Sequence, residues 1–451
     1  MNPELQRNLW LEFTPRRLIF MAAVLGLVFL AINSTFPARG LPLTAEYLFY
    51  AIVVVWGARN AAQAVIGEIR DRTWDLQRLS SLTPFAMTWG KLLGATSYVW
   101  FGGALCLAAY AYPMIARGDW PRAAYSLCYF LGIGLLAQSV ALFTSLLAVR
   151  RRQTHSRLDV FFYQAAGLAA GWGAYSAWQL TGGSGGANAV LPRGSLQWWI
   201  DADPLRFFLV SLAAFTAWAF VGCYRLMRLE LQIRNTPAVW IAFVAFLAFY
   251  VAGFRPVFSG FLAGEDSWTM RLLASGLAVT SLVYLAVLFE RKDKVLYRWM
   301  VEALAKGQFQ DVVLRLQAWM IAYAAAIILA LLLVARMASV TSVFDSSPLA
   351  GVAAVASALG FLTRDLAIFL LFPLMKGNRR GELPALVMLG LLYSVAPQLL
   401  AALGAPWLFA PALDAPAYAA LAPWAEALLL WIGVIRVGRR NLWPQGQPAR
   451  K

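Results

Sequence analysis

A charged, amphipathic stretch, Ile66–Gly94, separates two long apolar runs and holds the residues whose types and spacing are most informative. Its first part is rich in charged and polar residues, among them Glu68, Arg70, Asp71, Arg72, Thr73, Asp75 and Arg78. Leu76, Leu79 and Leu82 follow at intervals of three, which predicts one face of a short helix that ends at Pro84. The stretch is longer than a simple hairpin between two membrane helices needs. We therefore interpret it as a cytoplasmic contact element.

Four other charged residues fall inside apolar runs: Arg59, Arg364, Asp365 and Glu426. A charge within a membrane is costly in free energy and is by default a candidate for function. These residues are therefore candidates for lining a substrate path. Two structural explanations stay open, namely that Arg59 reaches the membrane surface with its long side chain and that Arg364 and Asp365 neutralise each other.

The stretch Ile66–Gly94 resembles the cytoplasmic loop of type-2 ABC exporter permeases. That family typically shows E-R-E-x-G-T-x-E-x-L-x-x-x-P, followed by G-K-L at the start of the third span. The residues in matching order are Glu68, Thr73, Asp75, Leu79, Pro84, Gly90, Lys91 and Leu92. The sequence departs from the pattern at Arg72, where the family usually has Gly, and at Ile69, where it often has Arg. The resemblance implies that this loop contacts a separate ATPase subunit.

The first 17 residues place Leu5, Leu9, Trp10 and Phe13 on one face of a helix, with charges opposite. This pattern predicts an amphipathic helix that lies on the membrane surface. It also resembles the interfacial elbow helix before the first span in the same permease family.

The composition predicts an all-α, polytopic integral membrane protein, because 61% of the 451 residues are hydrophobic and only 13% are charged. Apolar runs of about 20 residues recur along the chain, and each can cross a bilayer as a helix. About twelve spans are expected, with approximate bounds 18–33, 45–66, 92–115, 123–149, 158–180, 205–225, 238–254, 269–289, 318–336, 348–374, 384–404 and 418–435.

The net charge of +16 is interpreted as membrane topology and not as nucleic-acid binding. With an even number of spans, most Lys and Arg residues fall in the segments on the same side as the two termini. The positive-inside rule then places both termini in the cytoplasm. We expect the protein in the inner or plasma membrane. Membrane lipids and the ATPase are the expected partners, and a second copy of the chain is a further candidate.

Landmarks recur at a constant separation and indicate an internal repeat. Thr14–Pro15 is as far from Thr236–Pro237 as Glu68 is from Glu290, and the charge pattern after Glu290 also resembles that after Glu68. We therefore expect two tandem six-span halves, 1–237 and 238–451, the second of which has diverged. Glu290 and Asp293 are the corresponding candidate contacts for an ATPase.

No phosphate-binding loop of the form G-x-x-x-x-G-K-[ST] occurs, so ATP hydrolysis is expected in another subunit and not in this chain. The three cysteines, Cys106, Cys128 and Cys223, lie in apolar runs without CxxC spacing, and the single His155 lies in a basic loop. We expect no cofactor, no metal site and no catalytic residue.

Two other functions fit parts of the sequence. A major-facilitator secondary transporter also has twelve spans in tandem sixes, and Gly67 with Asp71–Arg72 matches half of its loop signature, which Asp293–Lys294 echoes. An integral-membrane transferase would need polar catalytic residues in an outer loop. Its candidates are Asp201, Asp203, Glu265 and Asp266, which no spacing links.

Overall fold

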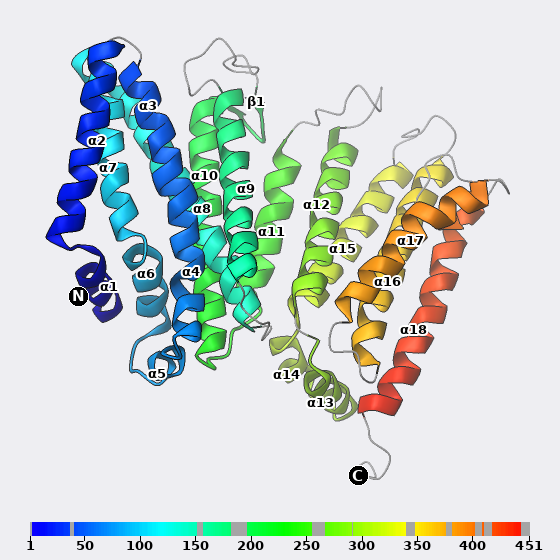
Figure 1. Ribbon diagram of the computed structural model, residues 1–451. Helices are drawn as coiled ribbons and strands as arrows, with labels where there is room; N and C mark the ends of the chain where they lie inside the picture. The colour runs from blue at the N-terminus through cyan, green and yellow to red at the C-terminus, as the bar shows by residue number, and fades with distance from the viewer. Residues whose placement is uncertain are drawn as a thin grey trace. The chain divides into compact units, whose positions relative to one another are not determined.

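A computed structural model describes residues 2–36, 40–150, 157–181, 196–254, 267–290, 292–339, 348–375, 381–401, 408–409 and 417–442. The described chain is almost entirely helical, and its one pair of strands is β1 (Leu196–Gln197) with β2 (Asp201–Ala202). It divides into two compact units (Figure 1). The first comprises Met1–Leu196 and Ile200–Asn235, and the second comprises Gln197–Trp199 and Thr236–Lys451.

The helices of the first unit, in chain order, are α1 (Pro3–Glu12), α2 (Pro15–Thr35), α3 (Gly40–Phe49), the π-helix η1 (Tyr50–Trp56), α4 (Gly57–Arg70), α5 (Trp74–Arg78), α6 (Pro84–Gly94), α7 (Ser97–Ala116), α8 (Trp120–Arg150), α9 (Arg157–Leu180) and α10 (Pro204–Glu230). Those of the second unit are α11 (Ala238–Gly253), α12 (Ser267–Phe289), α13 (Lys294–Ala305), α14 (Phe309–Leu314), α15 (Ala318–Ser339), α16 (Pro348–Leu374), α17 (Glu382–Ala401), the short 3₁₀ helix η4 (Ala417–Ala420) and α18 (Leu421–Leu442).

Ten helical segments of the described chain are long and apolar enough to cross a membrane, so the protein is an all-α, multi-pass membrane protein. They comprise α2, the continuous α3–η1–α4 segment, α7, α8, α10, α12, α15, α16, α17 and α18. Helices α9 and α11 also lie where the sequence predicts spans. However, α11 has only 16 residues, and α9 is not among the ten.

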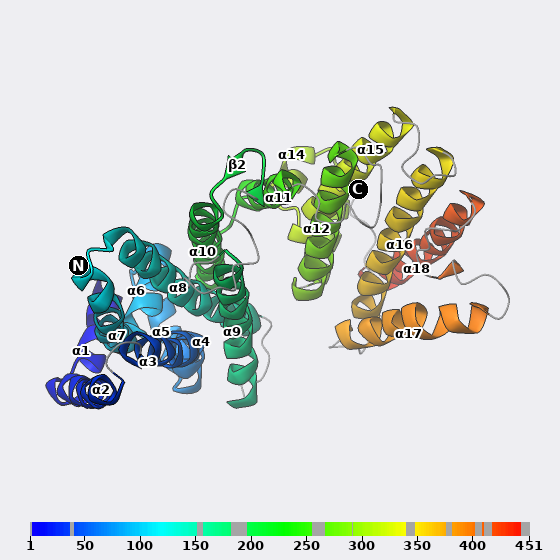
Figure 2. The ribbon, with the colours of Figure 1, turned by 90° about the horizontal axis from the view of Figure 1, so that it is seen from above.

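In the first unit, α8 is the central helix and packs against α4, α9 and α10, while α7 packs against α3 (Figure 2). Small residues let these helices approach closely. A Cβ atom at Gly134 of α8 would lie 2.8 Å from Val53 of η1 and from Trp100 of α7. The core around this point contains Phe49, Val53 and Ile133, all buried.

The α3–η1–α4 segment contains a π-helical turn, Tyr50–Trp56, whose wider backbone hydrogen bonding leaves carbonyls for side-chain donors. The buried Gln138 amide of α8 donates to the Val53 carbonyl at 3.0 Å and accepts from the indole nitrogen of Trp100 at 2.9 Å. Gln164 of α9 donates to the Val55 carbonyl at 3.0 Å. Side chains of two neighbouring helices therefore stabilise this turn.

In the second unit, α16 is the central helix and packs against α15, α17 and α18, while α12 packs against α11 and α15. Its core comes largely from α12 and α16 and includes Val283, Leu366 and Phe369. Packed pairs recur in the two units in the same order along the chain. Helix α7 packs on α3 as α15 packs on α12, and α8 packs on α10 as α16 packs on α18.

Candidate functional site

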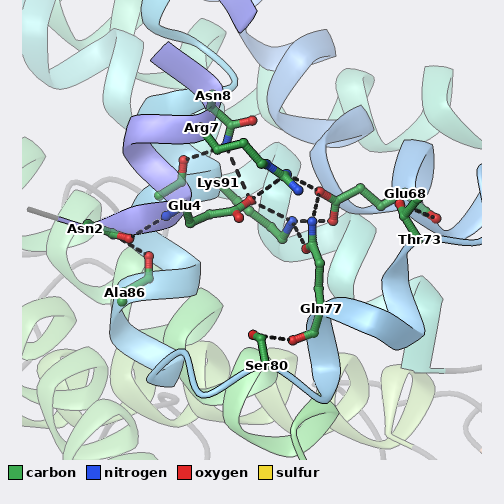
Figure 3. A network of polar contacts seen from close by, with 11 residues as sticks. Asn2, Glu4, Arg7, Asn8, Glu68, Thr73, Gln77, Ser80, Ala86 and Lys91 are labelled. Atoms are coloured by element: carbon green, nitrogen blue, oxygen red, sulfur yellow. Dashed lines mark hydrogen bonds and ion pairs between the residues drawn. The ribbon is translucent and has the colours of Figure 1, made fainter. Parts of the chain in front are cut away.

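The side chain of Lys91 on α6 is the centre of a polar network that joins α6 to three other helices of the first unit, α1, α4 and α5 (Figure 3). Its Nζ atom donates to Glu4 Oε1 at 3.2 Å, to Gln77 Oε1 at 2.8 Å and to Glu68 Oε2. It also lies 5.3 Å from the centre of the Trp74 ring, within the range of a cation–π contact. Only 1% of the lysine is exposed, so these partners replace its water shell.

A second cation balances the network. Arg7 Nη2 donates to Glu68 Oε1 at 2.6 Å and to Glu4 Oε1 at 3.0 Å. Gln77 Nε2 also donates to Glu68 Oε1 at 2.6 Å. The network thus pairs two cations with two carboxylates, and each carboxylate accepts from both cations.

Helix α1 lies close against α6 because two glycines of α6 face it. A Cβ atom at Gly90 would lie 2.7 Å from Glu4 Cβ, and one at Gly94 would lie 2.7 Å from Asn8 Cβ. Asn2 caps α1 by accepting from the Glu4 backbone nitrogen, and its amide donates to the Ala86 carbonyl. The predicted amphipathic helix therefore forms, but its polar Glu4 is buried whereas Trp10 is largely exposed.

Helix α4 ends in a turn that points the following segment away from the helix. Arg72 has a φ of 59°, and the Thr73 backbone nitrogen donates back to the Glu68 carbonyl at 2.9 Å. The Arg72 nitrogen donates to the Ile69 carbonyl at 3.2 Å, which completes a Schellman motif. Its left-handed position favours glycine, which is the residue that the permease family usually has where this chain has Arg72.

The helix predicted to end at Pro84 is shorter than expected, and Pro84 begins the next helix instead. Helix α5 covers only Trp74–Arg78, and Pro84 begins α6. The reason is local, since the Thr83 side chain accepts from the Ala86 nitrogen at 3.2 Å and a proline is well suited to the first turn. Periodicity alone would leave Trp74 exposed in this loop, yet it is 5% exposed because it lies beneath Lys91.

The segment from Arg70 to Leu79 holds most of the exposed residues that follow α4. Leu76 is 72% exposed and Leu79 is 86% exposed, while Leu82 is half-buried. The exposed polar and charged residues of this segment are Arg70, Asp71, Arg72, Thr73 and Asp75. We call the exposed residues from Arg70 to Leu79 the α5 ridge. It has a leucine pair flanked by charges of both signs.

In the second unit, Glu290 and Asp293 both support helix starts. Asp293 caps α13 by accepting from the Val295 nitrogen at 2.9 Å, and Glu290 Oε2 accepts from the Trp319 nitrogen at 3.2 Å. The hydroxyl of the partly buried Tyr297 donates to Gln317 Oε1 at 2.7 Å. Burial raises the pKa of Tyr297 above its usual value, so it remains a donor.

Three of the four candidates within apolar runs meet in the second unit. Arg364 Nε donates to Asp365 Oδ1 at 2.9 Å, and Arg364 Nη1 donates to Glu426 Oε2 at 2.9 Å. Two residues that the sequence analysis did not identify complete the cluster. The Tyr284 and Tyr393 hydroxyls donate to Asp365 Oδ2 at 2.7 Å and 2.6 Å.

Arg59, the fourth candidate, belongs to the first unit and lies on an exposed face of α4. The residues considered for a transferase do not form a site in the described structure. Asp203 caps α10 by accepting from the Leu205 and Arg206 nitrogens, both at 3.0 Å, whereas Glu265 and Asp266 lie outside the described residues, as does His155. Within the described ranges, no group of three or more His, Cys, Asp or Glu residues could hold a metal ion.

Sequence reasoning did not identify Glu4, Arg7 and Gln77 as members of the site. Each is a polar residue on an amphipathic helix, where solvent exposure is the ordinary expectation. The one available signal was Lys91 itself, a cation in the otherwise apolar segment Met87–Leu93. A lysine in such a position needs acidic partners if it is buried.

Comparison of the chain with known protein families, with curated proteins and with solved structures finds no match in any of the three.

Proposed function

We propose that the chain is the membrane-spanning subunit of an ATP-driven ABC exporter of the type-2 permease class, and that it works with a separate ATPase subunit. The observation that carries the proposal is the α5 ridge. Leu76 and Leu79 are exposed there, and the neighbouring Glu68 is held by the Lys91 network. Exposed leucines of this kind gain most by entering an apolar groove on a partner.

The Lys91 network gives the ridge a mechanical connection to the spans. Gln77 of α5 and Glu68 of α4 are held through Lys91 to α6, which directly precedes the spanning helix α7. A force on the ridge would therefore reach α4 and α7 together, while Glu4 and Arg7 bring α1 with them. Rigid movement of these elements is the expected response to ATP-driven closure of the partner.

The proposal includes twelve spans in two tandem halves, with both termini in the cytoplasm. It adds α9 and α11 to the ten long apolar helices. The matching order of packed helix pairs in the two units supports the tandem arrangement. The excess of Lys and Arg in the segments on the terminal side supports the orientation.

Docking is tested by replacing Leu76 and Leu79 together with Asp and by measuring which ATPase subunit co-purifies from native membranes. We expect the subunit to be lost while the permease keeps its yield and thermal stability, because both side chains are exposed. The matched control replaces Val295 and Phe309, which are 75% and 64% exposed in the second unit, with Asp. If only the control variant loses the ATPase subunit, the docking site lies in the second unit.

If neither variant affects co-purification, the docking proposal fails and a secondary transporter becomes the better explanation. The orientation is tested separately by reporter fusions at Lys451 and within residues 181–204. The two fusions should report opposite sides of the membrane. If both fusions report the same side of the membrane, the twelve-span topology is contradicted.

A further inference from the structure

A groove of about 590 Å³ lies in the second unit between α12 and α17, with α16 as its floor. Its walls are mostly apolar, and the lining residues are Ser281, Tyr284, Leu285, Leu288, Asp365, Phe369, Leu386, Leu389, Gly390 and Tyr393. All three helices are among those long and apolar enough to span a membrane. A molecule dissolved in the bilayer could therefore reach the groove without crossing water.

The exposure of the lining changes from lip to floor. Leu285 and Leu386 are half exposed at the lip, whereas Asp365 and Phe369 on the floor are buried. The groove thus combines an accessible apolar entrance with a buried charged group. Its size is in the range typical of sites for small molecules.

The floor carries negative electrostatic character toward the groove. Asp365 lines the groove, while its partner Arg364 lies behind it and is not part of the lining. Glu426 pairs with the other side of the same guanidinium. The described cluster therefore has two carboxylates for one cation, and its negative end faces the groove.

The aromatic residues favour a cation as well. Tyr284, Tyr393 and Phe369 line the same groove. Aromatic faces attract organic cations, most strongly where water is excluded. The Arg364 guanidinium already lies 4.9 Å from the centre of the Tyr393 ring, so Tyr284 and Phe369 supply the aromatic surface for a ligand. Because both tyrosine hydroxyls donate to Asp365, each oxygen still presents lone pairs to a ligand. An anion would meet the two hydroxyl oxygens, whose protons are already donated to Asp365.

We propose that this groove binds a lipophilic organic cation, whose charge lies against the Tyr284 and Tyr393 hydroxyls that cover the buried Asp365 and whose apolar body contacts Leu285, Leu386 and Leu389. Binding requires only the second unit's groove. That such a cation is the exported substrate rests in addition on the proposed transporter function.

The binding test uses the full chain purified in maltoside micelles and equilibrium dialysis with radiolabelled tetraphenylphosphonium. Tetraphenylborate is the control ligand, because it has nearly the same shape and the opposite charge. We expect saturable phosphonium binding at one site and at least tenfold weaker borate binding. Equal partition of both ions into protein and empty micelles would overturn the proposal.

Two variants test the location of the site. Asp365→Asn should weaken phosphonium binding at least tenfold. Gly390→Leu should block it, since a Cβ atom at Gly390 meets no atom within 4 Å and the new side chain can enter the groove without a clash. Gly276→Leu is the matched control, because Gly276 of α12 is equally open but does not line the groove.

The outcomes separate this inference from the transporter proposal, because the dialysis needs no ATPase. If Asp365→Asn does not fold, the location of the site is tested by comparing phosphonium binding of Gly390→Leu with that of Gly276→Leu. Unchanged phosphonium binding by Gly390→Leu overturns the site, even if an ATPase subunit co-purifies with the chain.

Discussion

Replacing Lys91 with Met should release helix α1 from α6, because it leaves the carboxylates of Glu4 and Glu68 with Arg7 as their one remaining cation. Removing one partner of a buried ion pair typically costs about 3–5 kcal/mol. Arg7 is partly exposed and stays in place, so we expect the lower end of this range, about 3 kcal/mol. Since about 1.4 kcal/mol is a factor of ten, the population of undocked α1 should rise roughly 100-fold.

The assay is hydrogen exchange of the backbone amides at the end of α1, measured on the purified full chain. Arg17→Met is the control, because the Arg17–Glu12 pair at 3.1 Å is exposed and such pairs contribute about 1 kcal/mol or less. Adding Glu68→Gln to Lys91→Met should recover part of the protection, since the variant then has one carboxylate for one cation. Exchange in Lys91→Met within threefold of wild type would refute the view that the network holds α1.

Three more perturbations follow from particular positions. Arg72→Gly should stabilise the end of α4 by about 1 kcal/mol, because a φ of 59° strains any residue with a Cβ. Local hydrogen exchange should therefore become slower, and faster exchange would argue against this strain. Gln138→Leu should lower the stability by about 1–3 kcal/mol in thermal unfolding, because the Val53 carbonyl loses its donor, and an unchanged melting temperature would contradict that role. Gly90→Ala should destabilise the folded chain by about 1–3 kcal/mol in thermal unfolding, because the new Cβ clashes with α1. Gly67→Ala should not, because a Cβ there meets no atom within 4 Å, and equal effects of the two variants would exclude the clash.

The sequence was sufficient for the helical, membrane-spanning character of the chain, because each long apolar run has to satisfy its backbone hydrogen bonds as a helix. It was not sufficient for local irregularities. Nothing in Tyr50–Trp56 distinguishes a π-helical turn from an α-helix, since the turn depends on Gln138 and Gln164 in other helices. The helix boundary at Pro84 was missed because proline fits the start of a helix as well as its end.

The candidate site shows the same division between local and long-range information. Periodicity placed Leu76 and Leu79 on one helix face, and both are exposed. Periodicity could not predict that Trp74 is buried, because its burial depends on Lys91, which lies on α6. Arg364 and Asp365 are adjacent in sequence and could be paired in advance, whereas Tyr284 and Tyr393 carry no charge signal and were found only through their contacts with Asp365.

The most direct test of the central claim is native mass spectrometry of the wild-type chain, tagged at its C-terminus and extracted from the membranes of its own cells. The account predicts a complex that contains this chain and a second polypeptide with a phosphate-binding loop, and that hydrolyses ATP. Recovery of the chain without any ATPase, under conditions that keep its own fold intact, would contradict the account.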